Sequence, residues 1–171
     1  WLVELALRNA GLNGCDDRLQ VVLGDVAAPP GGLAAESFDH VMLNPPYLEA
    51  GAGRVSSHEL RRLATVEGPA RLDIWLRCAV SLLRLRGSLT IIHRAERLHT
   101  ILSLLSETCG DLVVFPLWPH QGEGAKRILV QALKGSGGPL RVLPGLVLHN
   151  AAGGFTPQAE SVLRDAEGLA L

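Results

Sequence analysis

The sequence has few of the features that mark secreted, metal-binding or membrane proteins. Its three cysteines, Cys15, Cys78 and Cys109, are odd in number, far apart and without a C-x-x-C pair, so a reduced, cytoplasmic setting is the simplest interpretation. Its six histidines show no metal-ligand spacing, and we expect no metal cofactor. It also lacks a bilayer-spanning apolar run and a signal-peptide pattern, so no membrane partner is expected.

The sequence has no excess of either charge. Its 16 basic and 17 acidic residues leave a net charge of -1, whereas a protein that coats nucleic acid indiscriminately would be more basic. Any nucleic-acid contact must therefore come from a local patch. One candidate, diluted by nearby acidic residues, consists of Arg54, Arg61, Arg62, Arg71 and Arg77. On charge alone, an ordinary solvated face explains this patch equally well. Lys126 and Arg127 could contact phosphate or simply belong to a solvated hairpin.

Length and composition favour one globular domain. A chain of 171 residues with 47% hydrophobic and 19% charged residues can bury a core. A glycine-rich stretch at 135–138, followed by Pro139, marks a boundary. We therefore predict a main domain over residues 1–138 and a C-terminal extension over 139–171 that packs on it. Thr156 before Pro157 suits the cap and first position of a last helix.

Hydrophobic periodicity predicts alternating helices and strands. Helices are expected over 1–10, 69–85 and 95–109, and buried strands over 19–23, 38–43, 88–93, 112–117 and 128–133. The last two strands are too close for a helical crossover, so they should pair antiparallel. The alternation predicts an α/β fold with a mostly parallel sheet that ends in this pair. This arrangement resembles the Rossmann-like class I methyltransferase fold, whose first two strands would precede Trp1.

The strongest chemical signal is an apolar strand, 38–43, that runs directly into Asn44, Pro45, Pro46 and Tyr47. In open α/β sheets, ligands bind beyond the carboxyl ends of the strands. The Asn44 side-chain oxygen and the Pro45 carbonyl could accept hydrogen bonds from a planar amino group, which would favour positive charge developing on its nitrogen. This hypothesis requires Asn44 to face a cleft, and its strand not to lie at the outer margin of the sheet.

The residues around Asn44 suit the same chemistry. Proline restricts its own φ and the residue before it, so the two acceptors would be held rigidly. The ring of Tyr47 offers a face on which a base can stack. A simple Pro-Pro turn is the alternative interpretation.

Asp25 and Val26 form the second candidate site. They follow the predicted strand 19–23, and the carboxylate could accept a hydrogen bond from the adenine amino group of a cofactor while the N–H of Val26 meets a ring nitrogen. A turn or cap aspartate explains Asp25 about as well.

Together these motifs resemble the adenine-N6 methyltransferases that act on tRNA, in the bacterial group related to the tRNA(Val) adenine-37 enzyme. The matching positions are Gly24-Asp25-Val26, Asn44-Pro45-Pro46-Tyr47, Ala64, Glu67, Leu72, Trp75, and the segment from Gly87 to Leu98. The resemblance implies S-adenosyl-L-methionine as cofactor, with Asp25, Val26 and Asn44 binding it. It also implies an RNA substrate at Tyr47, Arg54, Arg61, Arg62 and Arg71.

The sequence departs from this family at its beginning. The family's glycine-rich turn after the first strand, and the acidic residue that ends the second strand and holds the ribose, have no counterpart here. We therefore expect a member that is truncated at its N-terminus and inactive as an isolated chain. Two other interpretations stay open: a protein glutamine methyltransferase of the release-factor type, and a non-catalytic methylase-like binding module.

Overall fold

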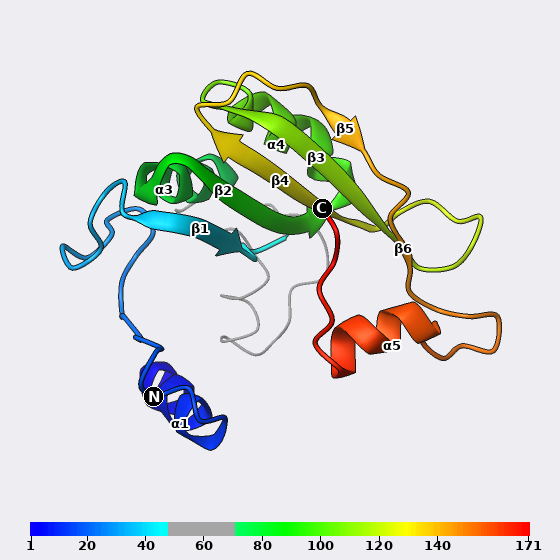
Figure 1. Cartoon of the computed structure of the whole chain (residues 1–171), viewed down its shortest axis with the longest axis horizontal. Coiled ribbons are helices and arrows are strands. Elements are labelled where there is room, and N and C mark those ends of the chain that lie inside the picture. The colour runs from blue at the N-terminus through cyan, green and yellow to red at the C-terminus, as the bar shows by residue number, and fades with distance from the viewer. Residues whose placement is uncertain (48–70) are drawn as a thin grey trace.

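The computed structural model describes residues 1–47 and 71–171, and a six-stranded mixed sheet forms its centre (Figure 1). The sheet order is β1 (Phe38–Leu43), β2 (Leu83–Arg94), β4 (Arg127–Lys134), β3 (Cys109–Trp118) and β5 (Arg141–Val142), and β6 (Leu146–Val147) also pairs with β3. β1 runs parallel to β2, β5 and β6 run parallel to β3, and the β2–β4 and β4–β3 pairs are antiparallel.

Several local predictions are confirmed. The predicted antiparallel pair is β3 and β4, which are in register at Val114 and Val130. The predicted helices appear as α1 (Leu2–Leu12), α3 (Leu72–Leu82) and α4 (Leu98–Leu105), with a 3₁₀ turn at Ala95–Arg97 before α4. The last helix is α5 (Pro157–Arg164), and the hydroxyl of Thr156 caps it by accepting a hydrogen bond from the Ala159 N–H at 3.2 Å.

Two predictions of secondary structure are wrong. Residues 19–23 form no strand, and Leu23 is 81% exposed. A strand needs a neighbour for its backbone N–H and C=O groups, and no described strand lies beside this segment. The helix predicted to extend to residue 85 ends at Leu82, because the N–H groups of Glu36 and Ser37 bind the carbonyls of Ser81 and Leu82 and the chain turns directly into β2.

α3 and α4 cover one face of the sheet, and the C-terminal segment covers the other. α3 and α4 lie behind β2, β4 and β3 in Figure 1. They bury one apolar cluster against the sheet, which includes Leu76, Leu89, Ile101 and Val130. On the other face, Phe115 and Leu117 pack with Leu146, from β6, and Ala159, from α5. Because β5 and β6 extend the same sheet, residues 139–171 share its core.

β1 lies at the margin of the described sheet, because it pairs with β2 along one edge only. Met42 is 82% exposed, and Phe38 is also exposed. The expectation that the Asn44 strand would avoid the margin is therefore wrong for this chain. α1 also lies apart from the sheet in Figure 1, and it exposes Leu2, Leu7 and Leu12. Both features count against catalysis by these 171 residues alone.

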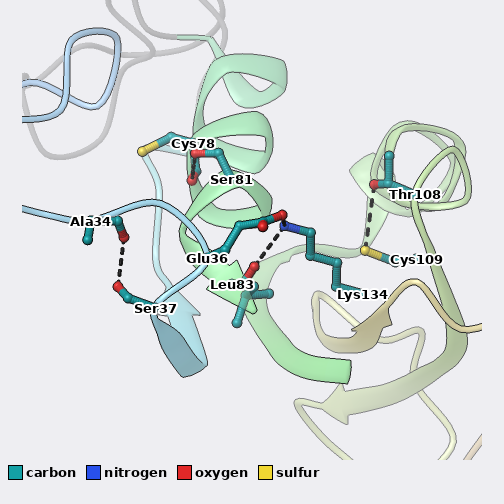
Figure 2. Close-up of polar contacts among 9 residues, drawn as sticks. All are labelled: Ala34, Glu36, Ser37, Cys78, Ser81, Leu83, Thr108, Cys109 and Lys134. Carbon is teal, nitrogen blue, oxygen red and sulfur yellow. Dashed lines mark hydrogen bonds and ion pairs between the residues drawn. The ribbon is translucent and has the colours of Figure 1, made fainter. Parts of the chain in front are cut away.

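The Lys134 side chain connects the segment just before β1 with the start of β2 (Figure 2). Its ammonium group donates to the Leu83 carbonyl at 2.7 Å and pairs with the Glu36 carboxylate at 3.0 Å. The Lys134 side chain is only 16% exposed, and Leu83 is fully buried. Removing the hydrogen-bond donor of a buried carbonyl costs more free energy than an equivalent solvent-exposed hydrogen bond contributes. Lys134 therefore stabilises the position from which β1 begins.

We expect Lys134→Met to lower the free energy of unfolding by about 1–3 kcal/mol, because the variant keeps the aliphatic stem but removes the donor to a buried carbonyl. Urea denaturation followed by tryptophan fluorescence measures this. Glu36→Gln is the control and should cost less than about 1 kcal/mol, since its partner interaction is an exposed ion pair. Equal stability of Lys134→Met and the unaltered chain would contradict the proposed role.

Candidate active site

The parallel pairing of β1 and β2 brings the predicted catalytic segment together with the end of β2. Leu43 lies opposite Ile91 in the register, so Asn44 to Tyr47 continue alongside His93 and Arg94. The rings of Tyr47 and His93 meet edge to face, with 5.4 Å between their centroids. The carboxyl ends of parallel strands share one edge of a sheet, which is where ligands bind in open α/β folds.

The four residues of the segment differ in their accessibility. Asn44 is exposed, Pro46 and Tyr47 are half-buried, and Pro45 is fully buried. The hydroxyl of Tyr47 donates a hydrogen bond to the Asn44 side-chain oxygen, which orients the amide. An amide oxygen carries two lone pairs, so it can accept from a second donor as well. Asn44 is thus an oriented and accessible acceptor, whereas the Pro45 carbonyl is covered in this conformation.

The side chain of His93 packs against Tyr47. Its imidazole is 0% exposed, and within the described residues neither ring nitrogen makes a hydrogen bond of normal geometry. Burial lowers its pKa, the nearby Arg97 guanidinium lowers it further, and backbone groups of Pro46 and Arg94 partly oppose the shift. The ring is therefore neutral near pH 7. In the sequence, His93 stood out only as part of the family resemblance, because burial at a strand end depends on what packs over it.

A basic pocket opens beside Tyr47. Its volume is about 520 Å³, and its walls are formed by Tyr47, Arg94, Ala95, Glu96, Ala125, Lys126 and Arg127. The Arg127 guanidinium carbon lies 5.8 Å from the centre of the Tyr47 ring. Arg94 and Arg127 are register partners in the β2–β4 pair. The sequence suggested Lys126 and Arg127 as phosphate contacts, but it did not indicate that Arg94 and Tyr47 would join them.

A smaller, mostly apolar cavity of about 210 Å³ lies beside Asp25 and Val26, which line it together with Leu43 and Trp75. Asp25 itself is exposed, and its carboxylate accepts a hydrogen bond from the Ala27 N–H at 2.9 Å. This geometry is that of a turn aspartate, and the remaining carboxylate oxygen can still accept from a ligand. Trp75, a half-buried residue of α3, provides an aromatic wall. Asn44 lines neither this cavity nor the basic pocket.

The remaining predicted substrate residues lie elsewhere. Arg71 is exposed and pairs with Asp73 at 3.5 Å, and it lines neither cavity. Asp73 also binds Arg77, so the described part of the arginine patch is partly neutralised. Other positions predicted from the patch or the resemblance lie outside the described residues: Arg54, Arg61, Arg62, Ala64 and Glu67.

Residues 1–47 and 71–171 lack two features. They contain no group of three or more His, Cys, Asp or Glu side chains arranged to hold a metal ion. No helix among them is both long enough and apolar enough to cross a membrane.

Comparison with solved structures places the fold. A crystal structure of a protein from Agrobacterium tumefaciens, described as a predicted O-methyltransferase, matches this chain with a TM-score of 0.72 and 27% sequence identity. The match covers 94% of this chain and 71% of that chain. No family model matches the sequence, and no curated protein matches it. The chain is therefore a methyltransferase-like protein with a mixed α/β sheet, and its resemblance to the adenine-N6 enzymes stays a prediction.

The lowered pKa of His93 predicts a pH dependence of stability. A histidine whose pKa is lower in the folded than in the unfolded state, where it is about 6.5, binds more protons when unfolded. Stability should therefore be constant with pH above about 6.5 as far as this group is concerned, and should fall as the pH drops below that value. Urea unfolding at pH 7.5 and pH 5.5 measures the change, and His93→Phe should lose less stability than the unaltered chain over this interval. An identical pH response of the two chains would refute the assignment.

Proposed function

We propose that this chain is the catalytic part of an S-adenosyl-L-methionine-dependent methyltransferase that methylates the N6 amino group of adenine in RNA, with tRNA as the expected substrate. The observation that carries the proposal is the exposed Asn44 amide, oriented by Tyr47 at the carboxyl end of β1. The methyltransferase-like fold supports the reaction class. The structural relative is described as acting on oxygen, so the choice of nitrogen rests on the residues of this chain.

Asn44 would stabilise the transition state of this transfer. The lone pair of an adenine amino group is delocalised into the ring, and a hydrogen bond to an oxygen acceptor helps to localise it on nitrogen. When bound, the cofactor would supply an electrophilic methyl group, and its sulfur would retain the electron pair of the broken S–C bond. As the N–C bond forms, positive charge develops on the nitrogen, and the Asn44 oxygen stabilises it more than it stabilises the neutral amine. The extra proton leaves afterwards, so no general base is needed before attack.

Pro45 and Tyr47 have supporting roles in the proposal. The Pro45 carbonyl would be the second acceptor, and because Pro45 is buried, it can act only after the segment opens. Tyr47 would stack against the target base while its hydroxyl holds Asn44 in place. His93, neutral and packed edge to face with the Tyr47 ring, keeps this ring in position without adding a charge near the developing cation.

The cavity at Asp25 fits part of the proposed cofactor. A planar adenine ring could lie between Leu43 and Trp75, with its amino group donating to Asp25. Its volume of about 210 Å³ is below the roughly 300–1,000 Å³ of sites that enclose a whole ligand of this size. The described residues that line it include no basic group for the methionine carboxylate. We therefore assign to Asp25 and Val26 the adenine end of the cofactor alone.

A second candidate function is a non-catalytic module that binds RNA. The marginal position of β1 and the small cavity at Asp25 favour it, since both weaken the case for catalysis by this chain. The release-factor glutamine methyltransferases are supported less well, because a basic pocket beside Tyr47 suits a phosphodiester better than a neutral amide.

The natural protein should form N6-methyladenine in tRNA, and Asn44→Ala should reduce the rate by about 100-fold or more, as loss of one preorganised hydrogen-bonding group does at other transition states. Mass spectrometry of nucleosides from treated tRNA measures both. Asn9→Ala, which removes an exposed amide on α1, is the matched control and should keep the rate. Methylation of release factor instead of tRNA would overturn the adenine assignment, and absence of any transfer would favour the binding module.

The isolated 171-residue chain should bind S-adenosyl-L-methionine weakly or not at all, because its described cavity accommodates only the adenine end. Isothermal titration calorimetry with the chain in the cell tests this. Tight binding would show that the chain holds the whole cofactor and would contradict the assignment of a partial site.

A further inference from the structure

The basic pocket beside Tyr47 carries an unbalanced local charge. The described residues that line it include three cations and one carboxylate, a net charge of +2 in a chain whose overall charge is -1. Arg94 and Glu96 neutralise each other through contacts of 2.9 and 3.1 Å. Lys126 and Arg127 are exposed and form no ion pair within the described residues. The pocket therefore has two cations available to an anionic ligand.

The backbone places these groups firmly. The Ala95 N–H donates to the Lys126 carbonyl at 3.1 Å, and Arg94 pairs in register with Arg127. These contacts join the end of β2 to the start of β4, so Arg94 and Arg127 lie on two bonded strands and Lys126 lies immediately before β4. The pocket is therefore a formed recess, with Tyr47 as one wall.

The contact between Arg127 and Tyr47 suggests what occupies the pocket. An exposed cation–π contact is weaker than a charge-assisted hydrogen bond between arginine and phosphate. A phosphate in the pocket would therefore draw the guanidinium away and uncover the face of the Tyr47 ring. The Arg127 guanidinium carbon lies 5.8 Å from the centre of the Tyr47 ring. A base stacked on this ring and the phosphate that flanks the base would therefore contact two groups that are close together.

Charge in the transition state favours the same ligand. Methyl transfer to an amine develops positive charge near Asn44, which is in contact with Tyr47. Two uncompensated cations beside Tyr47 would oppose that charge, and a bound phosphodiester would neutralise them. A neutral peptide substrate offers no such compensation.

We propose that the pocket formed by Tyr47, Arg94, Lys126 and Arg127 is a phosphodiester subsite that binds the RNA backbone next to the base presented to Asn44. This inference rests on the proposed function for the identity of the base. The binding of RNA by the pocket is separable from methyl transfer. The ligand class is a single-stranded or looped RNA, whose backbone and base are both accessible.

Fluorescence anisotropy with a labelled 12-nucleotide single-stranded RNA, titrated with the full chain between 50 and 200 mM salt, tests the subsite. Each lost phosphate contact should reduce the slope of log K against log salt by about 0.7. Arg127→Gln should therefore reduce it by about 0.7, and the Lys126→Gln/Arg127→Gln pair by about 1.4, with weaker binding at each salt concentration.

Two further variants make the result specific. Arg141→Gln removes an exposed cation from β5 that also has no ion pair in the described structure, and it should leave affinity and slope almost unchanged. Glu96→Gln removes the one carboxylate among the described residues of the pocket and releases Arg94, so it should tighten binding by about two- to fivefold, the range expected from an exposed ion pair. A gain in affinity would not arise from a misfolded variant.

The outcomes separate this proposal from the proposed function. Absent RNA binding, equal losses in Arg141→Gln and Arg127→Gln, or tighter binding of an acidic peptide than of RNA would overturn the subsite. If binding follows the prediction but the full-length protein forms no N6-methyladenine, the subsite stands and the catalytic proposal fails. If N6-methyladenine forms but Lys126 and Arg127 have no effect on binding, the reverse holds.

Discussion

The parallel pairing of β1 with β2 is the constraint on which the candidate site depends. It sets Leu43 opposite Ile91, and the next residues of both strands then leave the sheet at the same edge. Tyr47, whose hydroxyl binds Asn44, is thereby brought against His93 and lines a pocket with Arg94, about fifty residues further along the chain. At the other end of β1, the Lys134 ammonium group binds the Leu83 carbonyl and the Glu36 carboxylate. Contacts therefore hold the strand at its start as well as at the end that leads into the site.

Around this edge of the sheet, the described residues form apolar surroundings in one place and charged surroundings in another. On the side of α3, the cavity at Asp25 is mostly apolar and has an aromatic wall at Trp75. Beside Tyr47, the pocket at Arg127 is basic and open to an anion. Beneath the segment, His93 is buried and neutral. These three surroundings suit a flat base, a phosphodiester and a developing positive charge. For this reason, we connect the methyltransferase-like fold with a nucleic-acid substrate.

The marginal position of β1 limits what the chain does alone. One edge of the strand has no partner in the described sheet, Met42 is exposed, and residues 19–23 remain without regular structure despite an apolar sequence suited to a strand. Backbone hydrogen-bonding groups at a sheet edge remain available to another strand. The proposed chemistry therefore belongs to a form of the protein in which this edge is covered, and that agrees with the partial cofactor cavity at Asp25.

The sequence by itself determined the features that depend on neighbouring residues: the presence of α3 and α5, the Thr156 cap, the antiparallel β3–β4 pair, and an Asn-Pro-Pro-Tyr segment at a strand end. These follow from periodicity and local geometry. Only the tertiary structure decided the burial of His93, the meeting of Tyr47 with Arg127, the covered Pro45 carbonyl and the marginal place of β1. Each of these depends on which distant strand pairs with which, because register and burial are set by long-range packing that local patterns do not encode.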